Sequence, residues 1–170
     1  MRKIFIFLFL LFFGGCSYHF SLDKIKKEPR AIKITKIYIE PFINRTPERK
    51  LENLLINKLV YECNTGEIEV VRKERAEAFL TGEFTAYEAT GIAFTKGEYT
   101  ATGRVRIAVK VRLTDKKKNR LWEERELSDQ EEFQITTNPS QTQDNREKAI
   151  SRIMQRIAEQ IYEELRVAVF

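Results

Sequence analysis

Apolar side chains alternate with mostly charged ones along GRVRIAVKVRLTD, residues 103–115. Successive side chains of a strand point to opposite faces, so this period of two predicts a half-buried β-strand. Its apolar face carries Val105, Ile107, Val109, Val111 and Leu113. Its polar face carries Arg104, Arg106, Lys110 and Arg112. One face is therefore expected in the core, and the other is left to water or to a ligand.

The residues after this strand predict a hairpin, because DKKKN forms a polar turn and RLWEERELSDQEEFQI returns as the partner strand. With the turn centred on Lys117, Lys110 lies opposite Glu124. Arg112 then lies opposite Trp122, a residue expected in the hairpin or the core. Such cross-strand pairing would neutralise much of the basic face.

Three strand-like runs come earlier: AIKITKIYIEPF at 31–42, EIEVVR at 67–72 and AFLTGEFTAYEA at 78–89. In the first run the period of two shifts by one residue near Thr35 and Lys36, which predicts a bulge or a break. In the last run Leu80 and Phe84 share one face. Each run is therefore expected to add a strand to the same sheet.

A helix is predicted between the first two runs, within NRTPERKLENLLINKLVYECNTG. Thr46 is expected to cap it, Pro47 suits the first helical position, and Gly66 ends it. Its apolar face comprises Leu51, Leu54, Leu55 and Leu59.

A second helix is predicted at the end of the chain, after the loop TTNPSQTQDN at 136–145. Asp144 and Glu147 form a pair like a capping box at its start. Its core face comprises Ile150, Ile153, Met154, Ile157, Ile161 and Leu165.

These elements predict a single α+β domain over residues 31–170, a size that suits one domain. We expect a two-layer sandwich, in which two amphipathic helices pack on one face of a mostly antiparallel sheet of about four strands.

The first residues have the layout of a secretory signal. Arg2 and Lys3 precede an unbroken apolar stretch at 4–13, which is too short to span a bilayer. Residues 1–15 are therefore predicted to be a cleaved lipoprotein signal peptide. Without Arg2 and Lys3, 28 basic residues face 25 acidic ones, a net charge of +3. So mild an excess, with no nucleic-acid motif, predicts no nucleic-acid partner.

The cysteine after Gly14 and Gly15 resembles the attachment cysteine of a bacterial lipobox. From this resemblance we predict that Cys16 becomes the first mature residue and carries a diacylglycerol group and an N-linked acyl chain. Such an anchor is sufficient because several acyl chains together hold a protein stably on a membrane. Residues 16–30 then form a lipidated N-terminus and tether. Cys63, left single, is expected to be a small buried hydrophobe.

No catalytic or metal site is predicted. His19 is the only histidine and falls in the expected tether, so it cannot build a histidine-based triad. Zinc spacing is absent because Cys16 is assigned to lipid and Cys63 has no neighbouring ligand. A non-enzymatic protein without a cofactor, apart from the covalent lipid, is therefore expected.

The segments GCSYHF, IYIEPFINRTPERKLENLLINKL and RAEAFLTGEF, followed by the terminal amphipathic helix, resemble the LptE family of lipopolysaccharide-assembly lipoproteins. The resemblance covers nearly the whole mature chain. It implies a helix-on-sheet protein of the Gram-negative cell envelope, lipid-anchored on the periplasmic side of the outer membrane. It also implies a one-to-one complex with the large β-barrel that inserts lipopolysaccharide, whose assembly the lipoprotein supports and whose lumen it plugs.

Direct binding of lipopolysaccharide is a further implication, because Arg and Lys side chains on a fixed strand can meet the phosphates of lipid A. The candidate residues are Arg104, Arg106, Lys110, Arg112, Lys116, Lys117 and Lys118. An ordinary solvated or barrel-facing surface is the competing interpretation. An adaptor lipoprotein for cell-wall synthesis or a secretion system is the alternative function, and a lipid-processing enzyme is disfavoured by the missing site.

Overall fold

The computed structural model describes residues 34–94, 101–122 and 124–169. The elements in chain order are β1 (Lys36–Ile39), β2 (Ile43–Asn44), α2 (Leu51–Thr65), β3 (Glu69–Val70), η2 (Lys73–Arg75), β4 (Ala78–Phe94), β5 (Ala101–Asp115), β6 (Arg125–Ile135) and α3 (Pro139–Val169). The predictions made for Cys16, His19 and the rest of the first 33 residues lie outside the described part of the chain.

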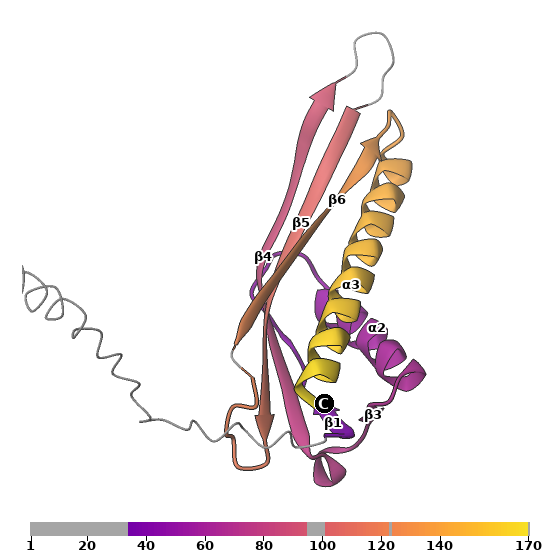
Figure 1. Cartoon of the computed structure of the whole chain (residues 1–170). Helices are drawn as coiled ribbons and strands as arrows, with labels where there is room; N and C mark the ends of the chain where they lie inside the picture. The colour runs from indigo at the N-terminus through magenta and orange to yellow at the C-terminus, as the bar shows by residue number, and fades with distance from the viewer. Residues whose placement is uncertain (1–33, 95–100, 123, 170) are drawn as a thin grey trace, which may run out of the picture. The chain divides into compact units, whose positions relative to one another are not determined.

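The α+β class with two helices is confirmed, but the sheet is larger and more mixed than expected (Figure 1). It is a curled six-stranded sheet in the order β3-β1-β4-β5-β6, with β2 also paired to β4. The long strands are antiparallel, whereas β1 runs parallel to both β3 and β4. The expectation of about four mostly antiparallel strands is thus corrected: a crossover through α2 returns the chain beside β1 in the same direction, which gives parallel pairing.

The hairpin of β5 and β6 follows the predicted register only near its turn. Thr114 bridges Arg120 there, as a turn centred on Lys117 requires. In the regular ladder, however, Lys110 lies opposite Glu126, not Glu124. The pairing therefore shifts by two residues, because β6 begins only at Arg125, after extra residues that the ladder does not use.

Both helices and the sheet bury one core, and Figure 1 shows the helices on the same side of the sheet. All five aliphatic residues of the predicted β5 face are at most 2% exposed. All six predicted core residues of α3 are at most 5% exposed. Burial of each such side chain contributes about 1.5–3 kcal/mol, so these residues of β5 and α3 are a large source of stability.

Helix α2 starts later than predicted, at Leu51. Asn44 explains the difference, because its side-chain oxygen accepts from the backbone N–H of Thr46 at 2.9 Å and its amide donates to the carbonyl of Glu48 at 2.7 Å. These bonds hold the segment in a turn, so Thr46 caps no helix. Lys50, with φ of 69°, then enters the helix from the left-handed region.

Helix α3 starts earlier than predicted, at Pro139, so most of the expected loop at 136–145 is helical. The carbonyl oxygen of the Asn138 side chain accepts from the backbone N–H of Ser140 at 3.0 Å, which makes Asn138 the cap. Proline directly after it suits the first helical position. Asp144 and Glu147 therefore lie inside the helix and form no capping box.

Candidate functional site

The uncovered face of the sheet carries a charge ladder, in which basic side chains of β5 lie beside acidic side chains of β4 and β6. In the β4–β5–β6 register, Lys110 lies between Glu83 and Glu126. Arg106 has Glu88 as its neighbour on β4. Opposite charges on directly paired residues attract, and each such pair contributes about 0.2–1 kcal/mol.

Ion pairs occupy part of the predicted basic stripe. The guanidinium of Arg104 binds the carboxylate of Glu132 at 2.8 Å. Arg112 binds Glu124, and its expected partner Trp122 instead packs against the hydrophobic core. Hydrogen bonding to Arg112 lowers the pKa of the Glu124 carboxyl below its usual value. Cross-strand acids therefore neutralise two of the four basic side chains of the β5 face, Arg104 and Arg112.

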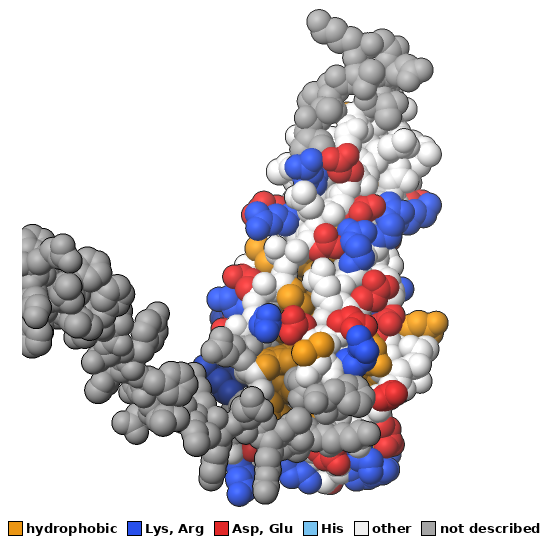
Figure 2. All heavy atoms as spheres, in the orientation of Figure 1, with side chains coloured by type: hydrophobic (Ala, Val, Ile, Leu, Met, Phe, Trp, Pro, Cys, Tyr) orange, Lys and Arg blue, Asp and Glu red, His pale blue; other side chains and the backbone are white. Residues whose placement is uncertain are grey.

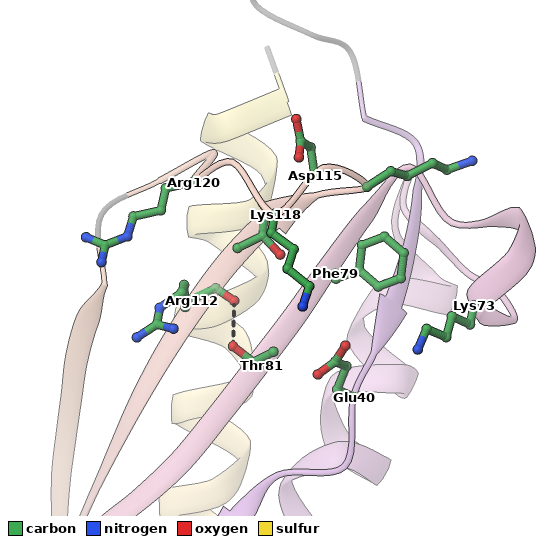
Figure 3. A pocket seen from close by; sticks show the side chains of 10 residues that line it. Glu40, Lys73, Phe79, Thr81, Arg112, Asp115, Lys118 and Arg120 are labelled. Atoms are coloured by element: carbon green, nitrogen blue, oxygen red, sulfur yellow. Dashed lines mark hydrogen bonds between the residues drawn. The ribbon is translucent and has the colours of Figure 1, made fainter.

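A hollow of about 490 Å³ lies at the turn end of this face (Figure 3). Its lining combines five cationic side chains with two carboxylates, together with Phe79, Thr81 and Thr114. The cationic residues are Lys73, Arg112, Lys116, Lys118 and Arg120, and the carboxylates belong to Glu40 and Asp115. The hollow is thus more positive than the balanced ladder beside it.

The turn that carries Lys118 is held by Asp115. Its carboxylate accepts from the backbone N–H groups of Lys117 at 2.7 Å and Asn119 at 2.9 Å, and from the Asn119 side chain at 2.8 Å. The Asn119 side-chain hydrogen bond is the largest cause that lowers the pKa of the Asp115 carboxyl. The Asp115 carboxylate therefore stabilises the turn, and its oxygens are already hydrogen-bonded there.

Lys118 adopts φ of 63°, in the left-handed region that favours glycine. A side chain in that conformation costs about 1–2 kcal/mol. Figure 3 shows Lys118 extending into the hollow between Phe79 and Arg112, while Lys73 enters from the opposite side. The residue with the strained backbone is therefore the one whose amine extends into the hollow.

Most cations of the hollow have no acidic partner among the described residues. The ion pairs found there include Arg112 but none of Lys73, Lys116, Lys118 and Arg120. Four amine or guanidinium groups are thus left to water or to an anion. Groups of this kind bind phosphate through charge-assisted hydrogen bonds.

Apolar surface lies beside these cations. Tyr38 and Phe79 form an edge-to-face aromatic pair with ring centroids 6.2 Å apart. A second hollow of about 390 Å³, which shares Glu40, Thr81 and Arg112 with the first, is lined by Pro41 and Ile43. Ile43 is 54% exposed, so an apolar ligand part would find contact next to the cations.

The structure gathers three of the seven candidate residues at the main hollow: Arg112, Lys116 and Lys118. Lys110 lines the second hollow. Arg104, Arg106 and Lys117 line neither of them. Sequence reasoning missed Lys73 and Arg120; Arg120 directly follows the basic turn and could have been included, whereas no local signal marks Lys73.

The expectation for Cys63 is confirmed. Cys63 is fully buried, and burial raises the pKa of its thiol to about 12, so it packs as a hydrophobe. In the part of the chain that the structure describes, no three metal-ligating side chains gather. Within the same residues, no helix has the length and apolar composition that crossing a membrane requires.

These features define an α+β domain of the helix-on-sheet class, with a cationic hollow on the uncovered sheet face. The family model of LptE, described as lipopolysaccharide assembly, matches residues 34–165. The chain therefore belongs to the LptE family and is a lipopolysaccharide-assembly protein.

Solved structures share this fold at low sequence identity. A minor lipoprotein from Acinetobacter baumannii is similar with a TM-score of 0.54 at 15% identity, covering 78% of this chain and 91% of that one. Lipoprotein B from Nitrosomonas europaea gives a TM-score of 0.51 at 16% identity, covering 79% of this chain and 83% of that one. No curated protein matches the sequence.

Proposed function

We propose that this protein is the lipid-anchored, non-enzymatic subunit of the β-barrel that inserts lipopolysaccharide into the outer membrane. The observation that carries the proposal is the LptE family match over residues 34–165. The subunit supports assembly of the barrel, plugs its lumen in a one-to-one complex, and binds lipopolysaccharide during insertion. Its uncovered sheet face supports this role, because a balanced charge ladder suits the polar lumen of a large barrel.

The cationic hollow is the proposed contact for lipopolysaccharide. Lipid A combines phosphates with acyl chains, and the hollow combines unpaired cations with the aromatic ring of Phe79. Lys73, Lys118 and Arg120 supply the phosphate contacts, and Ile43 lies beside them for apolar contact. Arg104 is left out of this set because Glu132 already binds its guanidinium.

Substitutions in one turn test this site. Lys118→Glu reverses a charge inside the hollow, whereas Lys117→Glu reverses a charge in the same turn but outside its lining. We expect lipopolysaccharide binding, measured by co-precipitation with the purified protein, to fall roughly tenfold for Lys118→Glu and little for Lys117→Glu. Equal losses in the two folded variants would remove the hollow as the site.

Lys118→Gly separates binding from folding. Glycine accepts a left-handed backbone freely, so the free energy of unfolding should rise by about 1 kcal/mol while the cation is lost. A variant that is more stable yet binds lipopolysaccharide less tightly would support a binding role for Lys118. Unchanged binding would assign Lys118 to the turn alone.

Membrane attachment is proposed at Cys16, with diacylglycerol and an N-linked acyl chain. Labelling cells with radioactive palmitate should label the intact chain and not Cys16→Ala. Co-purification from outer membranes then tests the partner: recovery of a large barrel in equal amount supports the proposal. Recovery of a cell-wall synthase or a secretion ring instead would favour the adaptor function, and turnover of a lipid substrate would contradict the non-enzymatic role.

A further inference from the structure

The positive charge of the chain is concentrated in two short segments. Residues 72–77 and 115–120 together carry seven basic and three acidic side chains, a net charge of +4. Outside them, the predicted mature chain carries 21 basic and 22 acidic residues and is therefore almost neutral. All seven basic side chains are exposed: Arg72, Lys73, Arg75, Lys116, Lys117, Lys118 and Arg120.

The fold brings these two segments together at one end of the sheet. Ala78, directly after the first segment, pairs with Asp115, the first residue of the second. Lys73 from the first segment lines the same hollow as Lys118 and Arg120 from the second. Figure 1 shows this end of the sheet beside β1 and β3. Residues 72–77 and 115–120 are called the basic end below.

Neighbouring acids do not cancel this charge. Glu67 and Glu69 come shortly before the basic end, and Lys36 is paired with Glu69 in the β1–β3 register. Including these three residues still leaves a net charge of +3. Two further acids at the end of α3 are already bound to arginines, in the pairs Glu163–Arg166 and Glu164–Arg125. The basic end therefore keeps its excess of positive charge.

The chain enters the described domain at this same end. The backbone N–H of Thr35 donates to the Glu77 carboxylate at 2.8 Å, and the backbone N–H of Glu77 donates to the carbonyl of Lys36 at 2.9 Å. Residues 17–33 connect Cys16 to this point, and such a length of chain spans at most about 60 Å. The basic end is therefore the end to which the predicted lipid anchor is joined.

We propose that the basic end docks on the phosphate headgroups of the bilayer that holds the anchor. An anionic lipid surface attracts Lys and Arg side chains within about one Debye length, roughly 8 Å at physiological ionic strength. The acyl chains of the anchor already retain the protein, so the basic end orients the domain on the surface. This inference rests on the proposed lipid attachment at Cys16, and not on the barrel or on binding of lipopolysaccharide.

The spread of the cations favours a surface over a single bound phosphate. Arg72 and Lys117 are exposed but line neither hollow. A bilayer presents many phosphates, so these two side chains contribute to docking as Lys118 does, whereas one phosphate held in the hollow would engage only its lining. The basic end contains no exposed large apolar side chain, so the contact is electrostatic and sensitive to salt.

Vesicle sedimentation tests the attraction without the anchor. The mature chain carrying Cys16→Ser has no lipid of its own, so its binding to vesicles reports the protein surface. We expect it to bind vesicles that contain phosphatidylglycerol and to bind vesicles of phosphatidylcholine alone only weakly. Binding to the anionic vesicles should be lost at 1 M salt, where the Debye length falls to about 3 Å.

Single neutralisations in the same assay locate the contact. Arg72→Gln and Lys117→Gln should each weaken binding to the anionic vesicles about fivefold, because each removes one cation from the surface. Lys148→Gln is the matched control and should change it little: Lys148 is exposed in the first third of α3, which Figure 1 shows at the other end of the sheet. A loss confined to Lys118→Gln would place one lipid phosphate in the hollow and overturn the surface contact.

Spin labels test the orientation of the full lipidated protein in anionic vesicles. Glu74→Cys places a nitroxide at the basic end, and Glu147→Cys replaces another exposed glutamate near the start of α3. Nickel held on chelating lipids lies at headgroup level and should broaden the spectrum of the first label much more than that of the second. The two ends of β5 are roughly 45–50 Å apart, so the contrast is large. Cys63 is fully buried and should not be labelled.

Salt-sensitive binding with similar losses at Arg72 and Lys117, together with stronger broadening at residue 74, would support the docking. No binding of the folded chain to anionic vesicles, or equal broadening at the two labels, would overturn it and leave the tests of the hollow and the barrel unaffected. Palmitate labelling of Cys16→Ala would contradict the proposed attachment instead, and the unlipidated chain would still report the basic end by itself.

Discussion

On one face of β5 the side chains of Val105, Ile107 and Val109 are fully buried beneath the helices, whereas on the other face Arg106 and Lys110 remain exposed. The two sets alternate along a single strand, so they share the same backbone and the same neighbouring strands. They differ in what lies above them: packed helices on one side and solvent on the other.

The covered face of β5 therefore contributes mainly to folding stability, whereas the uncovered face determines the charge of the surface. The covered face gains from burial of apolar area, and its residues must fit their neighbours. The uncovered face carries charges that are paired across strands, and exposed pairs contribute little to folding. Figure 2 shows acidic and basic side chains interspersed over the visible surface as well, so the cationic hollow is a local departure from balance.

The largest expected effect contrasts neighbours on β5. Ile107→Ala should lower the free energy of unfolding by about 2–5 kcal/mol, because Ile107 is fully buried and alanine leaves a cavity. Arg106→Ala, one residue earlier on the opposite face, should change it by less than about 0.5 kcal/mol. Urea unfolding of both variants measures the contrast, and similar losses would show that the two faces do not differ in this way.

A second contrast tests packing at two paired glycines. Gly103→Ala would place a methyl group 2.5 Å from the Phe133 ring, so we expect a loss of about 1–3 kcal/mol from overpacking. Gly91→Ala, directly opposite, meets open space and should be neutral or stabilise by up to about 1 kcal/mol. Thermal unfolding compares the two, and a harmless Gly103→Ala would mean that Phe133 moves aside freely.

A third contrast lies at the margin where the covered face meets solvent. Arg156 binds Asp129 at 2.6 Å and Glu131 at 2.9 Å, joining α3 to β6. Arg156→Gln should therefore cost about 1 kcal/mol in urea unfolding. Arg166→Gln, which removes only an exposed pair with Glu163 within α3, should cost almost nothing. Equal costs would show that the link between α3 and β6 adds no stability.

The smallest effect concerns the uncovered face alone. Hydrogen bonding to Arg112 lowers the pKa of Glu124, so Arg112→Gln should return that pKa toward the usual value for a glutamate. A depressed folded-state pKa adds stability above the ordinary pKa, and this is lost as the pH falls through the depressed value. Carboxyl NMR titration measures the pKa, and an unchanged value in Arg112→Gln would assign the shift to other groups.

Local periodicity was sufficient to predict the elements that build the core. The alternation in β5 and the helical spacing from Ile150 to Leu165 placed each aliphatic side chain on its buried face. Three candidate cations, Arg112, Lys116 and Lys118, were also found together at the hollow. These predictions succeed because period and turn chemistry are encoded within a few adjacent residues.

The predicted starts of both helices were wrong because an asparagine side chain near each start sets the course of the backbone. Asn44 holds the residues before α2 in a turn, whereas Asn138 with Pro139 begins α3 one turn and more before Asp144. Asn138 and Pro139 together are a helix start signal that the local sequence contains. The Asn44 turn competes with an equally good helix start at Thr46, so local pattern alone does not distinguish them.

Side-chain spacing along the chain is enough to specify which residues of β5 and α3 enter the core, and composition is enough to specify the basic character of the β5–β6 turn. Three features arise only when the elements pack together: the parallel pairing of β1 with β4, the two-residue shift that brings Arg112 to Glu124, and the position of Lys73 at the hollow. The reason is physical: side-chain period is a property of consecutive residues, whereas register and the meeting of distant charges depend on how separate elements pack.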